Sequence, residues 1–301
     1  MKSTIAVAVS LLLGGAAAAL PASAATTIQN KGSDTLVNVA QAWAEAYSAV
    51  NPDVAVAVSG GGSGTGIAAL INGTVDIANA SRKMKDKEVT LATENGHNPV
   101  EHVVGYDALA VFLNKNNPAK SLNFEQLAQI FGRGGKATKW TDIGLEVPGC
   151  KDQEIVVVSR QNSSGTYAYF KEAVLEPAAE EGHIAKGVYR QGTRDMSGSK
   201  DVVDLVENTP CAIGYSGLAY ATDKVKMACI SKASGGESEC VNPSVEGAVD
   251  GSYPIARPLF MYTSGEPEGA VKEYLDWIKS DAGQCIILKK GYAPYRPVTC
   301  N

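Results

Sequence analysis

Segments with a strand pattern alternate with segments of helical periodicity over almost the whole chain. Val54–Val58 is rich in β-branched residues, and Gly66–Asn72 after it carries apolar side chains at helical spacing. Two further pairs follow the same order: Val75–Ala78 with Lys85–Glu94, and Ile155–Val158 with Gly165–Leu175. A strand followed by a helix of this length is the repeating unit of a parallel sheet. The fold class that we expect is therefore α/β.

Helices are also expected near the two ends of the chain. Thr35–Val50 has an apolar face and stops at Asn51-Pro52, where proline ends the helical pattern. That face is formed by Leu36, Val39, Ala40, Trp43, Ala46 and Tyr47. Trp277–Ile287 reads as a second terminal helix.

The first residues have the order of a secretory signal. Lys2 precedes an apolar run from Ile5 to Leu20, and a small-residue cleavage site ends at Ala24. A membrane anchor would need roughly 20 apolar residues with flanking charges, and this run is too short. No Cys follows the run directly, so a lipid anchor at the new N-terminus is not expected. We expect a periplasmic protein cleaved after Ala24.

Chain length predicts how the remainder is organised. About 275 residues exceed the size at which one hydrophobic core usually stops growing, so two lobes are expected. Two extended segments, Val103–Asp107 and Tyr253–Pro258, are candidates for the crossings between them. The predicted division is residues 1–24 for the signal, 25–106 with 257–301 for lobe 1, and 107–256 for lobe 2.

The net charge of the chain excludes some classes of binding partner. A formal net charge of -5 argues against nucleic acid and anionic membranes.

Six Cys in an exported chain favour disulfides, whereas zinc would need ligand spacing that the three His do not have. Fifteen connectivities are open for six Cys. From separation alone we predict Cys229–Cys240, Cys285–Cys300 and Cys150–Cys211.

Small hydroxyl and glycine residues lie between a strand and a helix in four segments. Free backbone N–H groups at a helix start, together with the helix dipole, bind an anion without needing net charge. Ser or Thr before one helix is usually only a cap, but four such segments in one chain predict a shared anion site. The segments are Gly32–Leu36, Gly60–Gly66, Asn79–Arg82 and Ser159–Thr166.

Two of these segments carry an arginine, Arg82 and Arg160. The guanidinium fork suits phosphate, although a surface salt bridge is the alternative role of each. The glycine loop lacks the Lys-Ser/Thr of a P-loop and the spacing of G-x-G-x-x-G, so a nucleotide is not expected. G-x-S-x-G is absent, and no nucleophile–base pair or metal motif is evident. We expect no enzyme activity, no cofactor and no metal.

These motifs, taken in order, resemble the periplasmic phosphate-binding proteins that feed the high-affinity phosphate ABC transporter. The matching pieces are Gly32–Leu36, Gly60–Gly66, Asn72–Ala78, Ser81-Arg82, Ser159-Arg160 with Ser164–Thr166, Ala212–Tyr215 and Arg257–Leu259, which span nearly the whole mature chain. The resemblance implies a type II periplasmic-binding-protein fold whose two lobes, joined by two crossings, close on inorganic phosphate. It also implies a membrane permease as partner for a receptor that we expect to be a monomer.

The resemblance assigns donors position by position. Thr35, the backbone of Leu36 and Ser63 would donate from lobe 1, and Arg160, Ser164, Gly165 and Thr166 would donate from lobe 2. Ser81 and Arg82 stand where another branch of the family has an acceptor Asp. We therefore expect Asp107 to accept the phosphate proton, with Asp34 as second candidate. Either carboxylate could instead be a cap or an ion pair for Arg82 or Arg160.

The site alone leaves other functions open. Donors of this kind suit any tetrahedral oxyanion, so receptors for sulfate, arsenate or molybdate are alternatives, followed by a phosphoester hydrolase or an adhesin on the same scaffold. A fully deprotonated sulfate needs no acceptor, so an acceptor carboxylate in the site favours phosphate.

Overall fold

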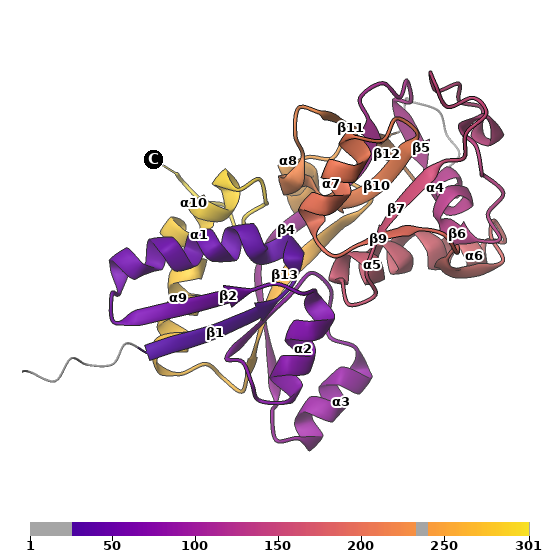
Figure 1. Ribbon diagram of the computed structural model, residues 1–301. Coiled ribbons are helices and arrows are strands. Elements are labelled where there is room, and N and C mark those ends of the chain that lie inside the picture. The colour runs from indigo at the N-terminus through magenta and orange to yellow at the C-terminus, as the bar shows by residue number, and fades with distance from the viewer. Residues whose placement is uncertain (1–25, 233–239, 301) are drawn as a thin grey trace, which may run out of the picture.

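One continuous mixed sheet runs through both halves of the computed structural model, which describes residues 26–232 and 240–300 (Figure 1). Its strand order is β2-β1-β3-β13-β4-β10-β7-β9, and β11 pairs with β4 outside that path. Its strands are β1 (Thr26–Gly32), β2 (Val54–Ser59), β3 (Ile77–Ala80), β4 (Pro99–Asn114), β7 (Val156–Arg160), β9 (Arg194–Met196), β10 (Ala212–Gly217), β11 (Val225–Met227) and β13 (Ala256–Ser264). Two small sheets pair β12 (Cys229–Ser231) with β5 (Ser121–Asn123), and β6 (Gly132–Arg133) with β8 (Lys186–Tyr189).

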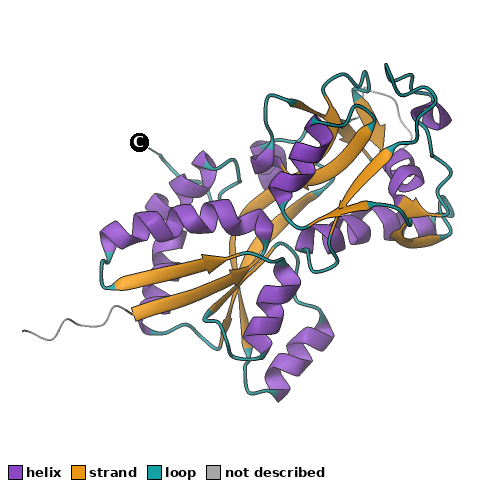
Figure 2. Ribbon diagram, in the orientation of Figure 1, coloured by secondary structure: helices purple, strands orange, loops and turns teal. Residues whose placement is uncertain are grey.

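Helices cover both faces of this sheet (Figure 2). They are α1 (Asp34–Val50), α2 (Ser63–Ile71), α3 (Asp86–Glu94), α4 (Phe124–Phe131), α5 (Gly165–Phe170), α6 (Glu176–Glu180), α7 (Ser199–Glu207), α8 (Val245–Asp250), α9 (Gly269–Lys279) and α10 (Asp281–Lys289). Shorter turns are η1 (Trp140–Ile143), η2 (Lys171–Leu175) and η3 (Leu218–Tyr220). Parallel pairing joins β1 to β2 and β3, and β7 to β9 and β10, whereas β4 and β13 are antiparallel. The α/β prediction is confirmed.

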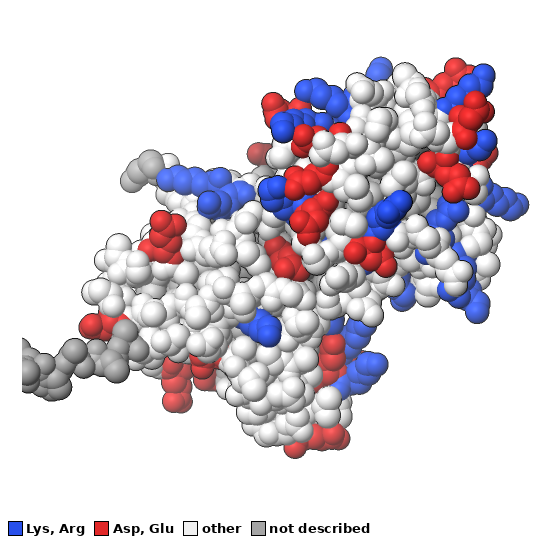
Figure 3. Space-filling model, viewed as in Figure 1, with Lys and Arg blue, Asp and Glu red and all other residues white. Residues whose placement is uncertain are grey.

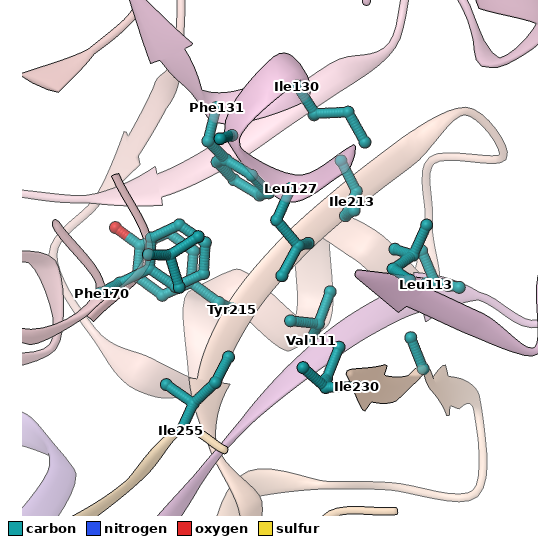
Figure 4. Packing of buried hydrophobic residues seen from close by; sticks show 14 of the residues in the cluster. Val111, Leu113, Leu127, Ile130, Phe131, Phe170, Ile213, Tyr215, Ile230 and Ile255 are labelled. Carbon is teal, nitrogen blue, oxygen red and sulfur yellow. The ribbon is translucent and has the colours of Figure 1, made fainter. Parts of the chain in front are cut away.

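The buried apolar residues form separate cores on either side of the place where the paired strands β4 and β13 pass from one half of the molecule to the other. Two clusters lie within 28–104 and 259–292, under α1, α9 and α10 on one face and α2 and α3 on the other. Two others lie within 108–255, with Ala293 as the one addition from the other half; Figure 4 shows part of the larger one. We propose 25–106 with 257–301, and 107–256, as the lobes, because the cores divide at these positions.

Two predicted helices differ from the helices that the structure shows. The Trp277–Ile287 prediction was wrong, because these residues belong to α9 and α10, and Ser280 separates the two helices. Ser280 is extended (ψ 168°) and its hydroxyl accepts from the Gly283 N–H at 3.5 Å, so it caps the start of α10. The predicted helix Gly165–Leu175 is not α-helical throughout, because α5 ends at Phe170 and a π-helical turn follows.

All three predicted disulfides are present: Cys150–Cys211, Cys229–Cys240 and Cys285–Cys300. Among the described residues no helix is long and apolar enough to cross a membrane. The predicted signal and its cleavage site at Ala24 lie outside those residues. On the face shown in Figure 3, acidic and basic side chains are interspersed over the lobe formed by 107–256.

Candidate functional site

The predicted donor segments meet where the two lobes face each other. β1 ends at Gly32 and leads into α1, β2 leads through the glycine loop into α2, and β7 ends at Arg160 before α5. β7 runs opposite to β1, because β13, β4 and β10 lie between them with three antiparallel pairings, so the carboxyl ends of strands in the two lobes face each other and the helix starts converge between the lobes. The convergence brings residues from both lobes into one buried cluster.

Three serine hydroxyls form the part of this cluster that lobe 1 supplies. Ser33 Oγ donates to Ser81 Oγ at 2.9 Å, and Ser63 Oγ lies 3.3 Å from the same atom. The Ser81 N–H donates to Ser63 Oγ at 3.0 Å. Ser63 and Ser81 were predicted site residues, and Ser33 joins them. All three are buried, so their remaining hydrogen-bonding capacity is directed within the site.

The two lobes touch directly at this cluster. Thr35 Oγ1 of lobe 1 lies 2.9 Å from Thr166 Oγ1 of lobe 2, and the Gly64 N–H donates to the Ser163 carbonyl at 2.8 Å. A Cβ atom on Gly165 would lie 2.3 Å from Ser63 Oγ and 2.6 Å from Ser81 Oγ. Glycine is therefore required at 165 for this approach.

Two predicted donors also serve their own helices. The Leu36 N–H donates to the Ser33 carbonyl at 3.1 Å, and its side chain lies in the core of lobe 1. Ser164 Oγ accepts from the N–H groups of Thr166 (3.1 Å) and Tyr167 (3.4 Å), which makes it the cap of α5. Accepting uses the lone pairs of Ser164 and leaves its hydroxyl hydrogen available to a ligand.

Arg160 is fully enclosed and held by several acceptors. Its guanidinium donates to Ser199 Oγ (2.9 Å), the Ser197 carbonyl (2.9 Å) and Asp34 Oδ2 (3.2 Å), and its Nε donates to the Met196 carbonyl (3.3 Å). Asp34 also accepts the Gly61 N–H at 3.0 Å through Oδ1. Burial lowers the pKa of Arg160, and the Asp34 carboxylate opposes that shift. Asp34 is thus an ion-pair partner that links the lobes.

Arg257 is the central cation of the cluster, although it was not among the predicted donors. Its Nη2 donates to Thr166 Oγ1 (3.0 Å), Thr35 Oγ1 (3.3 Å) and Asp107 Oδ2 (2.8 Å). Its Nη1 donates to the Ser81 carbonyl at 3.1 Å. Arg257 belongs to the motif Arg257–Leu259 and to the predicted crossing Tyr253–Pro258. The sequence did not predict that it lies opposite Asp107 in the register of β13 and β4.

Asp107 pairs with Arg257 and not with Arg82 or Arg160. Its Oδ2 takes both bonds from Arg257, at 2.8 and 3.2 Å, whereas its Oδ1 has no hydrogen-bond partner among the described residues. Burial raises the pKa of the carboxyl, while Arg257 and the nearby backbone N–H of Leu218 act to lower it. A buried acceptor without a partner is unusual, which makes Oδ1 a candidate contact for a ligand hydrogen.

Arg82 departs from the prediction. Its two terminal nitrogens donate to the two carboxylate oxygens of Glu88 at 2.8 Å each, and one also donates to the Lys83 carbonyl at 2.8 Å. Glu88 stands in the first turn of α3 and accepts the Lys85 N–H as well. Because this carboxylate occupies the guanidinium fork, Arg82 lies outside the hydrogen bonds that join the cluster among the described residues.

The assembled cluster suits a small oxyanion. Two arginines are balanced by two aspartates, and hydroxyl and backbone donors surround them, so a further anion would meet donors without a large excess of charge. In the part of the chain that the structure describes, no group of three or more His, Cys, Asp or Glu could hold a metal ion.

Comparisons with known proteins point to the same chemistry. The family model described as a PBP superfamily domain matches residues 17–282. The phosphate-binding protein PstS of Pseudomonas aeruginosa is 34% identical over 89% of this chain and 82% of its own length, and that of Bacillus subtilis is 33% identical over 87% and 79%.

Solved structures agree with these relatives. A Clostridium perfringens protein with bound phosphate superposes with a TM-score of 0.76 at 29% identity, covering 90% of this chain and all (100%) of that one. An ABC-type phosphate transport receptor from Vibrio cholerae gives 0.67 at 26% identity, with 90% and 100% covered. The chain therefore belongs to the PBP superfamily and, within it, to the family of the phosphate-binding protein PstS.

Proposed function

We propose that this protein captures inorganic phosphate between its lobes and delivers it to the membrane permease of an ABC transporter. The observation that carries the proposal is the contact of Thr35, Thr166 and Arg257 beside the unpaired Asp107 Oδ1. The donors from both lobes suit the unprotonated oxygens of a hydrogen phosphate, and the one free acceptor suits its single O–H. The names of the relatives support the same ligand.

The proposed ligand shell draws on both lobes. Its members are Thr35, the Leu36 N–H, Ser63, Ser81, Asp107, Arg160, Ser164, Gly165 and Thr166, with Arg257 in the place predicted for Arg82. A bound phosphate would take the hydroxyl hydrogen that now joins Thr35 Oγ1 and Thr166 Oγ1, and the second hydroxyl could also turn to it. Its own O–H would donate to Asp107 Oδ1, so a hydrogen phosphate gains a bond that sulfate cannot make.

The same proposal covers the cellular setting. The protein would act without catalysis, as an exported periplasmic monomer that loses its signal after Ala24. Relatives named for phosphate binding and transport support a receptor in place of a hydrolase. Direct contact between the lobes supports a receptor that closes around its ligand.

Titration calorimetry with phosphate and sulfate, repeated across pH, tests this function. We expect one phosphate bound per chain and a clear preference for phosphate over sulfate at neutral pH. Molybdate and arsenate serve as further competitors, since arsenate shares the O–H and molybdate at neutral pH does not. Tight sulfate or molybdate binding with weak phosphate binding would replace the proposed ligand.

A further inference from the structure

Tyr215 ends a motif that the ligand shell does not use. Its side chain is fully buried in the core of lobe 2, where its ring stacks on Phe170 with centroids 4.2 Å apart and an interplanar angle of 8° (Figure 4). Tyr189 lies beside the same stack, with its ring centroid 6.1 Å from that of Tyr215 and 4.3 Å from that of Tyr167. These contacts fix where the two tyrosine hydroxyls can point.

The hydroxyls form a chain of hydrogen bonds with only one possible direction. Tyr189 OH donates to the Tyr167 carbonyl at 2.9 Å, so its single hydrogen is used there. Tyr215 OH, 2.7 Å away, must then donate to Tyr189 OH. Ser159 Oγ, 2.7 Å from Tyr215 OH, is left as the donor to Tyr215. The order is Ser159 to Tyr215 to Tyr189 to the Tyr167 carbonyl.

The two ends of this chain adjoin the two parts of the lobe 2 ligand shell. Ser159 directly precedes Arg160 at the end of β7, and Tyr167 directly follows Thr166 in the first turn of α5. The strand end and the helix start are otherwise joined by the turn 161–164. A buried relay of three hydrogen bonds behind them sets the spacing between the arginine and the helix-start donors.

Burial raises the pKa of both Tyr215 and Tyr189. Both hydroxyls therefore keep their protons throughout the neutral and mildly alkaline range. The relay keeps one direction under every condition in which phosphate binding would be measured.

We propose that Tyr215 and Tyr189 are positioning residues that hold Arg160 and Thr166 at the separation that a bound phosphate requires. They touch no ligand in this scheme, and the proposal rests on the proposed phosphate function. The hydroxyl, not the ring, is the group that acts, because the stack alone does not connect β7 to α5.

Tyr215→Phe tests the hydroxyl, since phenylalanine keeps the ring stacked on Phe170. Tyr262→Phe is the matched control: Tyr262 is also buried, also has two hydroxyl partners (Glu101 at 2.7 Å, Met84 N–H at 3.2 Å), and lies in lobe 1 outside the ligand shell. Both variants should lose similar stability in urea. Only Tyr215→Phe should bind phosphate more weakly, by about threefold to tenfold, the range for one or two buried hydrogen bonds.

Hydrogen exchange gives a second readout that needs no ligand. In Tyr215→Phe the Thr166 and Tyr167 amides, which Ser164 caps, should exchange several-fold faster than in the parent and in Tyr262→Phe. Ser159→Ala should add little further loss of affinity to Tyr215→Phe, because both break one relay. Unchanged exchange and affinity in Tyr215→Phe, or equal loss of affinity in Tyr262→Phe, would overturn the proposal. A parent chain that binds no phosphate would instead overturn the function, and the exchange rates would still decide the positioning role.

Discussion

Two arginine–aspartate pairs stand in one site but join different parts of the molecule. Arg257 and Asp107 face each other in register on β13 and β4, with side chains 1% and 0% exposed. Arg160 and Asp34 face each other from opposite lobes, with side chains 1% and 18% exposed. The first pair joins two hydrogen-bonded strands at the crossing between the lobes, so we expect it to persist whether the lobes are open or closed. The second can form only when the lobes meet.

The difference in placement predicts a difference in what each pair does. When both partners of an ion pair are buried, water cannot reach the charge that remains after one partner is lost. Breaking such a pair therefore lowers the free energy of unfolding strongly. A pair with one partly exposed partner lets water reach the carboxylate when the contact is lost, so its contribution to stability is smaller. We therefore expect the Arg257 pair to hold the crossing together and the Arg160 pair to act mainly on binding and closure.

Arg257→Met gives the largest expected effect. The substitution leaves Asp107 buried without a cation, so the free energy of unfolding should fall by about 3 to 5 kcal/mol, with phosphate binding also lost. Without Arg257 the pKa of Asp107 should rise further. A raised folded-state pKa makes the native state bind more protons than the unfolded state, so the variant should regain stability as the pH falls through that pKa towards the ordinary pKa of an unfolded Asp. Urea unfolding at several pH values measures both effects.

Arg160→Met provides the contrast for that experiment, because Asp34 can turn towards water. If the two methionine variants lost equal stability and showed the same pH dependence, the distinction between the two pairs would be wrong.

Arg160→Ala should act on affinity more than on stability. Loss of charge-assisted hydrogen bonds to the anion should weaken phosphate binding by about 1.5 to 3 kcal/mol, roughly tenfold to a hundredfold. Arg82→Ala is the matched control, because Arg82 is buried and paired but its partner is Glu88. Calorimetry should show near-parent affinity in Arg82→Ala. Weakening there equal to that in Arg160→Ala would return Arg82 to the ligand shell.

Local signals explain what the sequence could predict. Strand–helix alternation and hydroxyl residues at helix starts act over a few residues, and the α/β class and the hydroxyl cluster followed from them. Two disulfides join Cys that are 11 and 15 residues apart, which left Cys150 for Cys211. Arg257 was missed as a donor because its role depends on the register of two strands 150 residues apart, which no local pattern encodes. The pairing of Arg82 with Glu88, at the start of α3, is the salt-bridge alternative, and no local pattern selected Glu88 as its partner.

Among the effects on anion binding, Asp107→Asn is expected to give the smallest, a change in selectivity. Its unpaired Oδ1 can accept the O–H of a hydrogen phosphate, and its charge discourages a sulfate that offers no hydrogen. An asparagine keeps one acceptor for Arg257 but removes the negative charge, so sulfate should gain while phosphate loses. We expect the preference for phosphate over sulfate to fall by about tenfold, or about 1.4 kcal/mol.

Acidic pH should reproduce this change in the parent chain. Burial raises the pKa of Asp107, so the carboxylate gains a proton at a higher pH than an ordinary Asp, and the protonated group then donates where it had accepted. Selectivity in the parent should therefore decline as the pH falls towards that pKa, whereas Asp107→Asn, whose side chain cannot titrate, should show only the pH dependence that comes from the protonation of phosphate itself. Competition binding with phosphate and sulfate over this range measures both chains. A variant that kept full selectivity, or a parent profile identical to that of the variant, would make Asp107 a purely structural partner of Arg257 and pass the acceptor role to Asp34 or a backbone carbonyl.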